Sequence, residues 1–443
     1  MGATEILAAF IARLRYEDLP TEVVEAAKVA IIDGVSVMLA GTTQPLAAVI
    51  SDYTKDLGGA PHCTVVGFGF KTNAPSAAFA NGVFGHCLDF EIQGDPPTHG
   101  TSSCLPAALA LGEKTGASGK TLIESYVLGW EVQGRLRAAT ARATNPAYHP
   151  PGLVGPLGSA AASAKTLGLD AYHTSMALGI AASRTGGLTA NTGTMVKSTH
   201  PGNAARMGVE AAMLAQAGFT SSEDILETHN GYAEALFQGD VDWDTITDGL
   251  GDTYRLITPG FDIKRFPAQL HMQRSIEAAI NLRQRNNLQA DMVEALVLEV
   301  RDRGHSKAIP RSGLDGKFSV EYCAAAALLD GRVDIETFTD ERRFSADMEE
   351  LLPRVRVAPS DEPMSVNAIA KLKDGRTVSE VCRDFTGSVA NPMSRDERLA
   401  KAQGCARRVL SEQDTKRLID LLENLEELND VSELMNILGK KHV

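Results

Sequence analysis

Residues 364–382 read MSVNAIAKLKDGRTVSEVC, and this stretch indicates the fold of the part of the chain around it. Apolar and polar residues alternate on both sides of Asp374-Gly375, as in two half-buried strands joined by a hairpin turn. Residues 292–301 (MVEALVLEVR) alternate in the same way and predict another strand. Between these strands, residues 318–330 (FSVEYCAAAALLD) are typical of a helix. We therefore predict a small α+β unit in this region.

The rest of the chain predicts helices. Residues 21–40 carry apolar side chains at helical spacing, and residues 101–140 predict two helices separated between Gly116 and Gly119. From about residue 393 the chain is charged and helical again, and its apolar spacing predicts packing on the first helices. Small residues let helices approach closely, so segments rich in Ala, Gly, Ser and Leu predict buried central helices: 152–168, 170–183 and 203–218.

A chain of 443 residues is too long for one compact hydrophobic core, so we expect two domains. The predicted fold is mainly α with an α+β lid. Residues 1–268 and 393–443 are expected to form a large all-helical domain from both ends of the chain. Residues 269–392 are expected to form the smaller inserted lid domain.

Composition excludes several classes of function. The formal net charge of −13 argues against nucleic acid as a partner, although a local cluster of basic side chains can still bind a small anion. No apolar run reaches the roughly 18 residues that a membrane helix needs, and the amino-terminal segment is typical of an amphipathic helix and not of a signal peptide. The six cysteines are scattered without a CxxC pair. We therefore expect a cytoplasmic protein that does not act at a membrane.

Polar residues interrupt the apolar pattern in four places, and each place contains a histidine. Loops that lead into helix amino termini offer free N–H groups, which suit carboxylates, and sites often lie between domains. The four clusters are HCLDFEIQGDPPTHG (86–100), YHPPG (148–152), KSTHPGN (197–203), which is expected to precede a helix, and KRFPAQLH (264–271) at the expected domain boundary.

Other interpretations exist for each cluster. A single histidine near a helix end is often only a cap, Asp89 can simply pair with a local cation, and Lys264-Arg265 can be a solvated pair. A zinc site made by His86, Asp89 and His99 is a further alternative, but HExxH and cysteine pairs are absent from the sequence. The sequence also lacks a P-loop, a Rossmann fingerprint and a GxSxG nucleophile elbow.

Taken together, the ordered clusters resemble the MmgE/PrpD family over nearly the whole chain. The resemblance implies a helical domain with a smaller lid, a homodimer, and acid–base chemistry on small polycarboxylates with neither a metal nor an organic cofactor. The matching stretches are NGVFGHCLDFEIQGDPPTHGTSSCLPAALALGE (81–113), YHPPGLVGPLGSAAASAKTLGL (148–169), KSTHPGNAARMGVEAAMLAQAGFT (197–220), IKRFPAQLH (263–271) and FSVEYCAAAALLDG (318–331).

Residue by residue, the resemblance implies a catalytic set and a substrate-binding set. His99 or His149 would be the general acid or base, Asp89 would orient a histidine, Lys197 would neutralise a carboxylate, and the lid residue Tyr322 would exclude water or donate a proton. The substrate-binding set would be Gln93, His200, Lys264, Arg265, Gln269 and His271.

Two departures from the family pattern leave the reaction open. The family's first motif commonly continues as D-F-D-D-T, whereas this chain has Glu91, Ile92 and Gln93 after Phe90. Gln269 replaces a histidine found in some members. We predict a lyase, either a dehydratase or a decarboxylase, acting on a di- or tricarboxylate of the methylcitrate or cis-aconitate type. The alternatives are an epimerase of a dicarboxylate such as iminodisuccinate, and a non-enzymatic binding protein.

Overall fold

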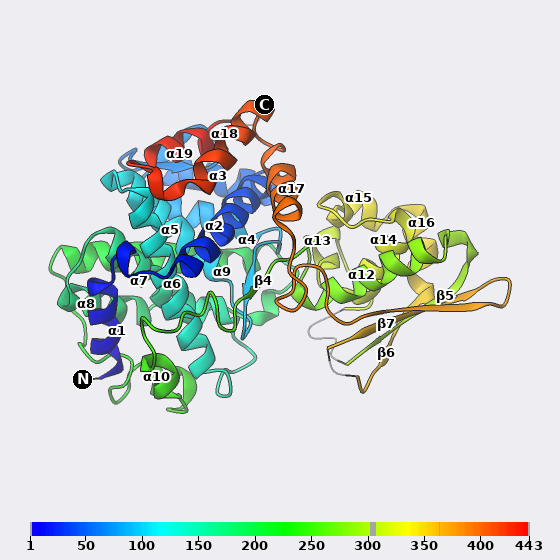
Figure 1. Ribbon diagram of the computed structural model, residues 1–443, viewed down its shortest axis with the longest axis horizontal. Helices are drawn as coiled ribbons and strands as arrows, with labels where there is room; N and C mark the ends of the chain where they lie inside the picture. The colour runs from blue at the N-terminus through cyan, green and yellow to red at the C-terminus, as the bar shows by residue number, and fades with distance from the viewer. Residues whose placement is uncertain (1, 302–306, 363, 442–443) are drawn as a thin grey trace.

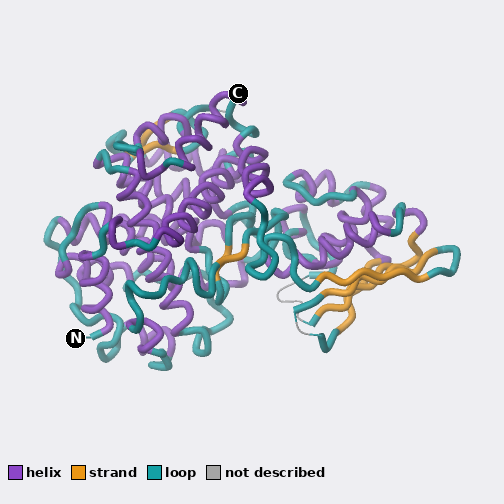
Figure 2. Tube along the Cα trace, viewed as in Figure 1, coloured by secondary structure: helices purple, strands orange, loops and turns teal. Residues whose placement is uncertain are grey.

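The computed structural model describes residues 2–301, 307–362 and 364–441. A large helical body carries both ends of the chain, and a smaller unit with a sheet projects from one side of it (Figure 1). Strands are concentrated in this smaller unit, apart from short pairs in the helical body (Figure 2). The protein is therefore mainly α with a small α+β part, as the sequence predicts.

Several helices of the helical body match predicted segments, and close packing explains their small residues. A Cβ atom added at Gly82 would lie 2.8 Å from the Cα of Gly202, so these two helices touch through their backbones. The helices are α1 (Ala3–Arg13), α2 (Thr21–Gly41), α3 (Pro45–Leu57), α4 (Ala74–His86), α5 (Gly100–Thr115), α6 (Gly119–Ala139), α7 (Pro150–Thr166), α8 (Ala171–Ala182), α9 (Val196–Gln216), α10 (Tyr232–Phe237), α11 (Trp243–Thr247), α17 (Arg395–Ala406), α18 (Glu412–Glu423) and α19 (Ser432–Leu438).

The sheet unit contains the predicted hairpin. Its strands are β5 (Val293–Val300), β6 (Val355–Pro359), β7 (Val366–Leu372) and β8 (Thr377–Cys382), in the order β6-β5-β7-β8. Strands β7 and β8 are antiparallel, and alternate residues of β7 are buried, which confirms the period-two pattern. Strand β6 pairs with β5 in parallel and was not predicted. The helices of this unit are α12 (Leu270–Arg285), α13 (Gly313–Gly316), α14 (Val320–Asp330), α15 (Asp340–Arg343) and α16 (Ala346–Leu351).

The chain builds two large hydrophobic cores. The first takes residues from Ala3 to Ile263 and again from Met393 to Leu438. The second takes residues from Phe266 to Phe385. Helix α17 packs on α2, which confirms that the carboxy-terminal segment returns to the first helices. Within the described ranges, no helix combines the length and apolar character needed to cross a bilayer.

Two expectations about the first 270 residues are wrong. The region is not wholly helical, because it contains the pairs β1 (Cys63–Val65) with β2 (Phe70–Thr72) and β3 (Gln93–Gly94) with β4 (Phe261–Asp262). Helix α9 also begins at Val196, so the predicted loop 197–203 is its first two turns. The sequence misled here because Pro201 and Gly202 are ordinarily helix breakers.

Candidate active site

A cavity lies where the helical body meets the start of the sheet unit. The pairing of β3 with β4 brings the first polar cluster beside the chain segment that leads into Lys264. The residues that line the cavity are Asp89, Gln93, Pro97, His99, Arg137, Ala141, Thr144, Pro146, Tyr148, His149, Pro150, Pro151, Thr189, Thr192, Lys197, Gln269 and His271.

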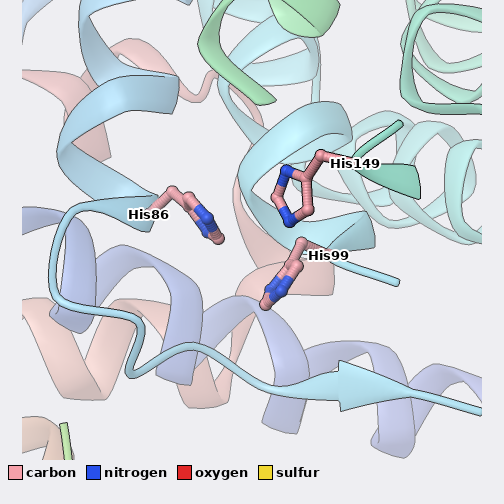
Figure 3. A group of neighbouring side chains, drawn as sticks. All are labelled: His86, His99 and His149. Carbon is pink, nitrogen blue, oxygen red and sulfur yellow. The ribbon is translucent and has the colours of Figure 1, made fainter. Parts of the chain in front are cut away.

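Three histidines from separate segments lie close together (Figure 3), and two of them, His99 and His149, line the cavity. His86 ends α4, His99 precedes α5 and His149 precedes α7. The ring centroids of His86 and His99 are 4.4 Å apart, and His149 lies 5.9 Å from the first and 6.0 Å from the second. The fold therefore gathers residues separated by up to 63 positions into one site.

Asp89 is buried between two lysines. Lys197 Nζ donates to Asp89 Oδ2 at 2.7 Å, and Lys264 Nζ donates to Asp89 Oδ1. Burial alone favours the neutral carboxyl, but the two ammonium groups outweigh it and hold the pKa of Asp89 well below its usual range. Asp89 has a φ of +50°, a left-handed conformation that aspartate and asparagine tolerate better than most residues.

Three lysines distant in sequence hold the loop around Asp89 through its main-chain carbonyls. Lys317 donates to Cys87 O at 3.0 Å, Lys264 to Asp89 O at 3.1 Å and Lys401 to Phe90 O at 2.8 Å. They come from the sheet unit, from the segment that leads into it, and from α17. The unusual backbone at Asp89 is thus fixed by tertiary contacts.

Glu91 continues the charged network toward the cavity. Its Oε1 lies 2.5 Å from His86 Nδ1 and accepts a hydrogen bond from Ser102 Oγ at 3.1 Å. His99 Nδ1 lies 2.9 Å from the same oxygen but, among the described groups, has no hydrogen-bond partner. Burial opposes ionisation, but His86 and His99 hold the pKa of Glu91 well below its usual range.

The histidines at the site are neutral at pH 7. Burial, reinforced by the Lys197 ammonium, lowers the pKa of His86 to about 3 and that of His200 to about 4. Burial also lowers the pKa of His99, and it lowers that of His149 much further. His149 and His200 face each other through their Nδ1 atoms at 3.0 Å. Neutral imidazoles of this kind can accept protons from a substrate.

The structure brings most of the predicted residues to the cavity. Lys264 and His200 lie directly behind the lining, where Lys264 contacts Asp89 and His200 contacts His149. The predicted residues that line the cavity itself are Asp89, Gln93, His99, His149, Lys197, Gln269 and His271.

Two predicted residues lie elsewhere. Tyr322 is buried in the second core, where its hydroxyl donates to Thr337 O at 2.5 Å. Arg265 is half exposed and lies 3.6 Å from Glu277. Among the described residues, neither belongs to the cavity lining. The motif order alone could not show this, because Arg265 follows a lysine that points inward and Tyr322 lies in the first turn of α14, a helix whose residues are buried from Val320 to Leu328.

Sequence reasoning missed two basic residues near the site. Lys317 is fully buried, and burial lowers its pKa to about 8. Arg137, in the last turn of α6, lines the cavity. Lys317 directly precedes the FSVEYC segment that resembles the family, and this position could have identified it. Arg137 lies in a helix without any recognisable motif.

Two overlapping groups have the composition of a metal site: His86 with His99 and His149, and Asp89 with Glu91 and His99. In each group one member, His86 in the first and Asp89 in the second, is already engaged by lysine ammonium groups. Lys197 Nζ lies 2.9 Å from His86 Nε2, and both oxygens of Asp89 accept from lysines. A metal ion would have to replace these ammonium groups, so the residues as arranged do not fit one.

The fold and this site define a class that comparison with known proteins identifies directly. The model of the MmgE/PrpD N-terminal domain matches residues 5–244, and that of the MmgE/PrpD C-terminal domain matches residues 266–427. The chain belongs to the MmgE/PrpD family.

Several relatives that align with this chain over nearly its full length are cis-aconitate decarboxylases. The chain is 32% identical to the cis-aconitate decarboxylase of Mus musculus, with 99% of this chain and 93% of the relative aligned. It is 32% identical to the Homo sapiens cis-aconitate decarboxylase over 98% of this chain and 94% of the relative. A cis-aconitate decarboxylase of Aspergillus terreus is 27% identical over 99% and 96%. The similarity therefore spans essentially the full length of both proteins.

Proposed function

We propose that this protein is a lyase that needs no cofactor and acts on a small tricarboxylate of the cis-aconitate type, as a decarboxylase or dehydratase. One observation carries the proposal: a buried network runs from Lys264 through Asp89, Lys197, His86 and Glu91 to His99 at the cavity. The names of the full-length relatives support the choice of substrate.

The hydrogen bonds of this network assign roles to its members. Because Lys197 donates to His86 Nε2, neutral His86 carries its proton on Nδ1 and donates it to Glu91. Glu91 in turn favours a proton on Nδ1 of His99, which leaves the lone pair on His99 Nε2. His99 is then the general base, Glu91 and His86 are positioning residues, and Lys197 presents a positive charge to the substrate.

The chemistry requires these elements. In a decarboxylation, the bond between a carbon and its carboxylate breaks, carbon dioxide leaves, and the electron pair spreads into a neighbouring carboxylate. Lys197 stabilises that negative charge, and a proton from water, relayed by a cavity histidine, then adds to the carbon that carries it. In a dehydration, a base removes a proton beside a carboxylate and hydroxide leaves with a proton as water. His99 and His149 both line the cavity and are suited to these proton transfers.

The proposed catalyst consists of two domains and acts as a homodimer in the cytoplasm. We place the division at 268/269 and 392/393, because the second core lies almost wholly between these positions. Gln269 and His271 then approach the substrate from the smaller domain, which acts as a lid. The family resemblance supports the dimer, and six buried free thiols suit a reducing compartment.

The test is a substrate screen followed by NMR in heavy water. The purified protein is incubated separately with cis-aconitate, methylcitrate, citrate and iminodisuccinate. Release of carbon dioxide with a new alkene signal is expected for a decarboxylase, and an alkene without carbon dioxide for a dehydratase. Solvent exchange with loss of optical activity would instead establish the epimerase, which the pair His99 and His149 on one cavity also permits. If the protein turns over none of the four compounds, the proposal is wrong.

Replacing Tyr322 with Phe tests whether this residue is catalytic or structural. Because its hydroxyl is bonded within the second core, we expect kcat to change less than about threefold and the free energy of unfolding to fall by about 1–3 kcal/mol. Urea unfolding and turnover measure the two effects. The exposed Tyr172→Phe is the matched control. A hundredfold loss of kcat at unchanged stability would restore the catalytic role.

A further inference from the structure

Arg137 stands apart from the other cations of the site. It lies in the last turn of α6 and lines the cavity together with Pro97 and Thr144. Its Nε donates to Pro97 O at 3.2 Å, which fixes the direction of the guanidinium. Its Nη1 is buried and, within the described ranges, has no hydrogen-bond partner. A buried N–H without an acceptor is costly, so the fold holds a donor ready for something it does not itself supply.

The charges around the cavity show what is missing. Lys197 and Lys264 share the single carboxylate of Asp89, so each of them already has an anionic partner within the protein. The ion pairs of the described chain include no carboxylate bound to Arg137. Asp95 attracts it only from a distance. A polycarboxylate that entered the cavity would therefore find, in Arg137, a lining cation that has no carboxylate partner among the described residues.

We propose that Arg137 binds a carboxylate of the substrate that takes no part in the bond changes. The inference rests on the proposed function, because it concerns the same cavity, and it specifies the substrate as having at least two carboxylates. Lys197 holds the reacting end beside His99, and Arg137 holds a remote end from α6. Arginine suits this role because its planar fork matches a carboxylate and stays charged when half buried.

The same assignment explains how a substrate is oriented. Gln269, from the proposed lid, also lines the cavity, and its Oε1 is buried without a partner among the described groups. A substrate carboxylate can pair with the donor on α6, whereas the acceptor on the opposing unit suits a substrate hydroxyl. A remote carboxylate fixed by Arg137 determines which carbon of the substrate faces His99.

Calorimetry with tricarballylate, a saturated tricarboxylate without the double bond that the reaction uses, tests the proposal independently of turnover. Arg137→Gln is expected to weaken tricarballylate binding by about 10- to 100-fold, the usual worth of a charge-assisted hydrogen bond. Arg137→Lys keeps the positive charge but lacks the planar guanidinium. Its affinity for tricarballylate should lie between that of the unmodified protein and that of Arg137→Gln. Arg142→Gln removes an exposed arginine outside the lining and should bind like the unmodified protein.

Kinetics separate this inference from the proposed function. On a substrate that the protein turns over, Arg137→Gln should raise KM by a similar factor and change kcat less than about threefold. Unchanged tricarballylate binding in Arg137→Gln, or no binding by the unmodified protein, overturns the inference. The protein could also bind tricarballylate through Arg137 and yet turn over no polycarboxylate. That result would support the carboxylate-binding role of Arg137 and reject the proposed lyase function. Thermal unfolding of each variant establishes that it is folded.

Discussion

Replacing Asp89 with Asn is expected to lower kcat by about 100- to 1,000-fold and the free energy of unfolding by about 3–5 kcal/mol at pH 7. The carboxylate is buried and bound by Lys197 and Lys264. Its loss leaves two ammonium groups in a low-dielectric site without a counter-charge. Asn has nearly the same shape and tolerates the positive φ of this position, so the variant tests the charge and not the backbone.

The pH dependence of stability gives the Asp89 prediction a definite sign. The pKa of Asp89 is depressed in the folded protein, so its contribution is complete above the unfolded value of about 3.9 and is lost as pH falls through the lower folded pKa. Urea unfolding should show a constant difference in the free energy of unfolding between the unmodified protein and Asp89→Asn from pH 6 to 8. This difference should narrow only below about pH 4. Asp52 is exposed on α3, so Asp52→Asn should have the same free energy of unfolding as the unmodified protein. An Asp89→Asn protein with unmodified stability and turnover would contradict the network.

Replacing His99 with Ala is expected to lower kcat/KM by about 100- to 10,000-fold, the usual contribution of a general base. His99 lines the cavity and is neutral at pH 7 because burial lowers its pKa. The unmodified protein should therefore lose activity only as pH falls below the ordinary histidine value of about 6.5, when His99 becomes protonated. This acid limb of the profile should disappear in the variant.

Steady-state kinetics from pH 5 to 8 measure the His99 effect. His62→Gln, which alters an exposed histidine, is the matched control and should leave the profile unchanged. If His99→Ala keeps turnover within tenfold of the unmodified protein, His99 is not the base. A His149→Ala variant, measured beside it, would then show whether the second histidine of the cavity has that role.

The first polar cluster illustrates what a motif conveys and what it omits. In the sequence, Ile92 and Gln93 stand where the family's D-F-D-D-T motif has its last Asp and its Thr, and Glu91 stands where it has the preceding Asp. In the structure, Glu91 contacts His86 and His99 through one oxygen and thereby connects Lys197 to the cavity. A longer side chain at this position retains a carboxylate in the network. The sequence could not show this, because the distance that a side chain spans depends on where the helices place its partners.

The sequence by itself determined most of the long helices, the hairpin and seven of the residues that line the cavity. Periodicity and small-residue content are local properties, and they dictate local structure: 364–382 folds as the predicted hairpin, and 101–140 as two helices. The order of the motifs along the chain also identified the family resemblance. These features need only neighbours within about a dozen positions.

Only the tertiary structure decided which polar residues meet. Lys264, Lys317 and Lys401 lie far apart in sequence, yet all three hold the loop around Asp89. The same packing directs Tyr322 into a core and turns Arg137 toward the cavity. The physical reason is that a buried charge is stable only beside its partner, and that partner is set by how helices and sheet pack in three dimensions.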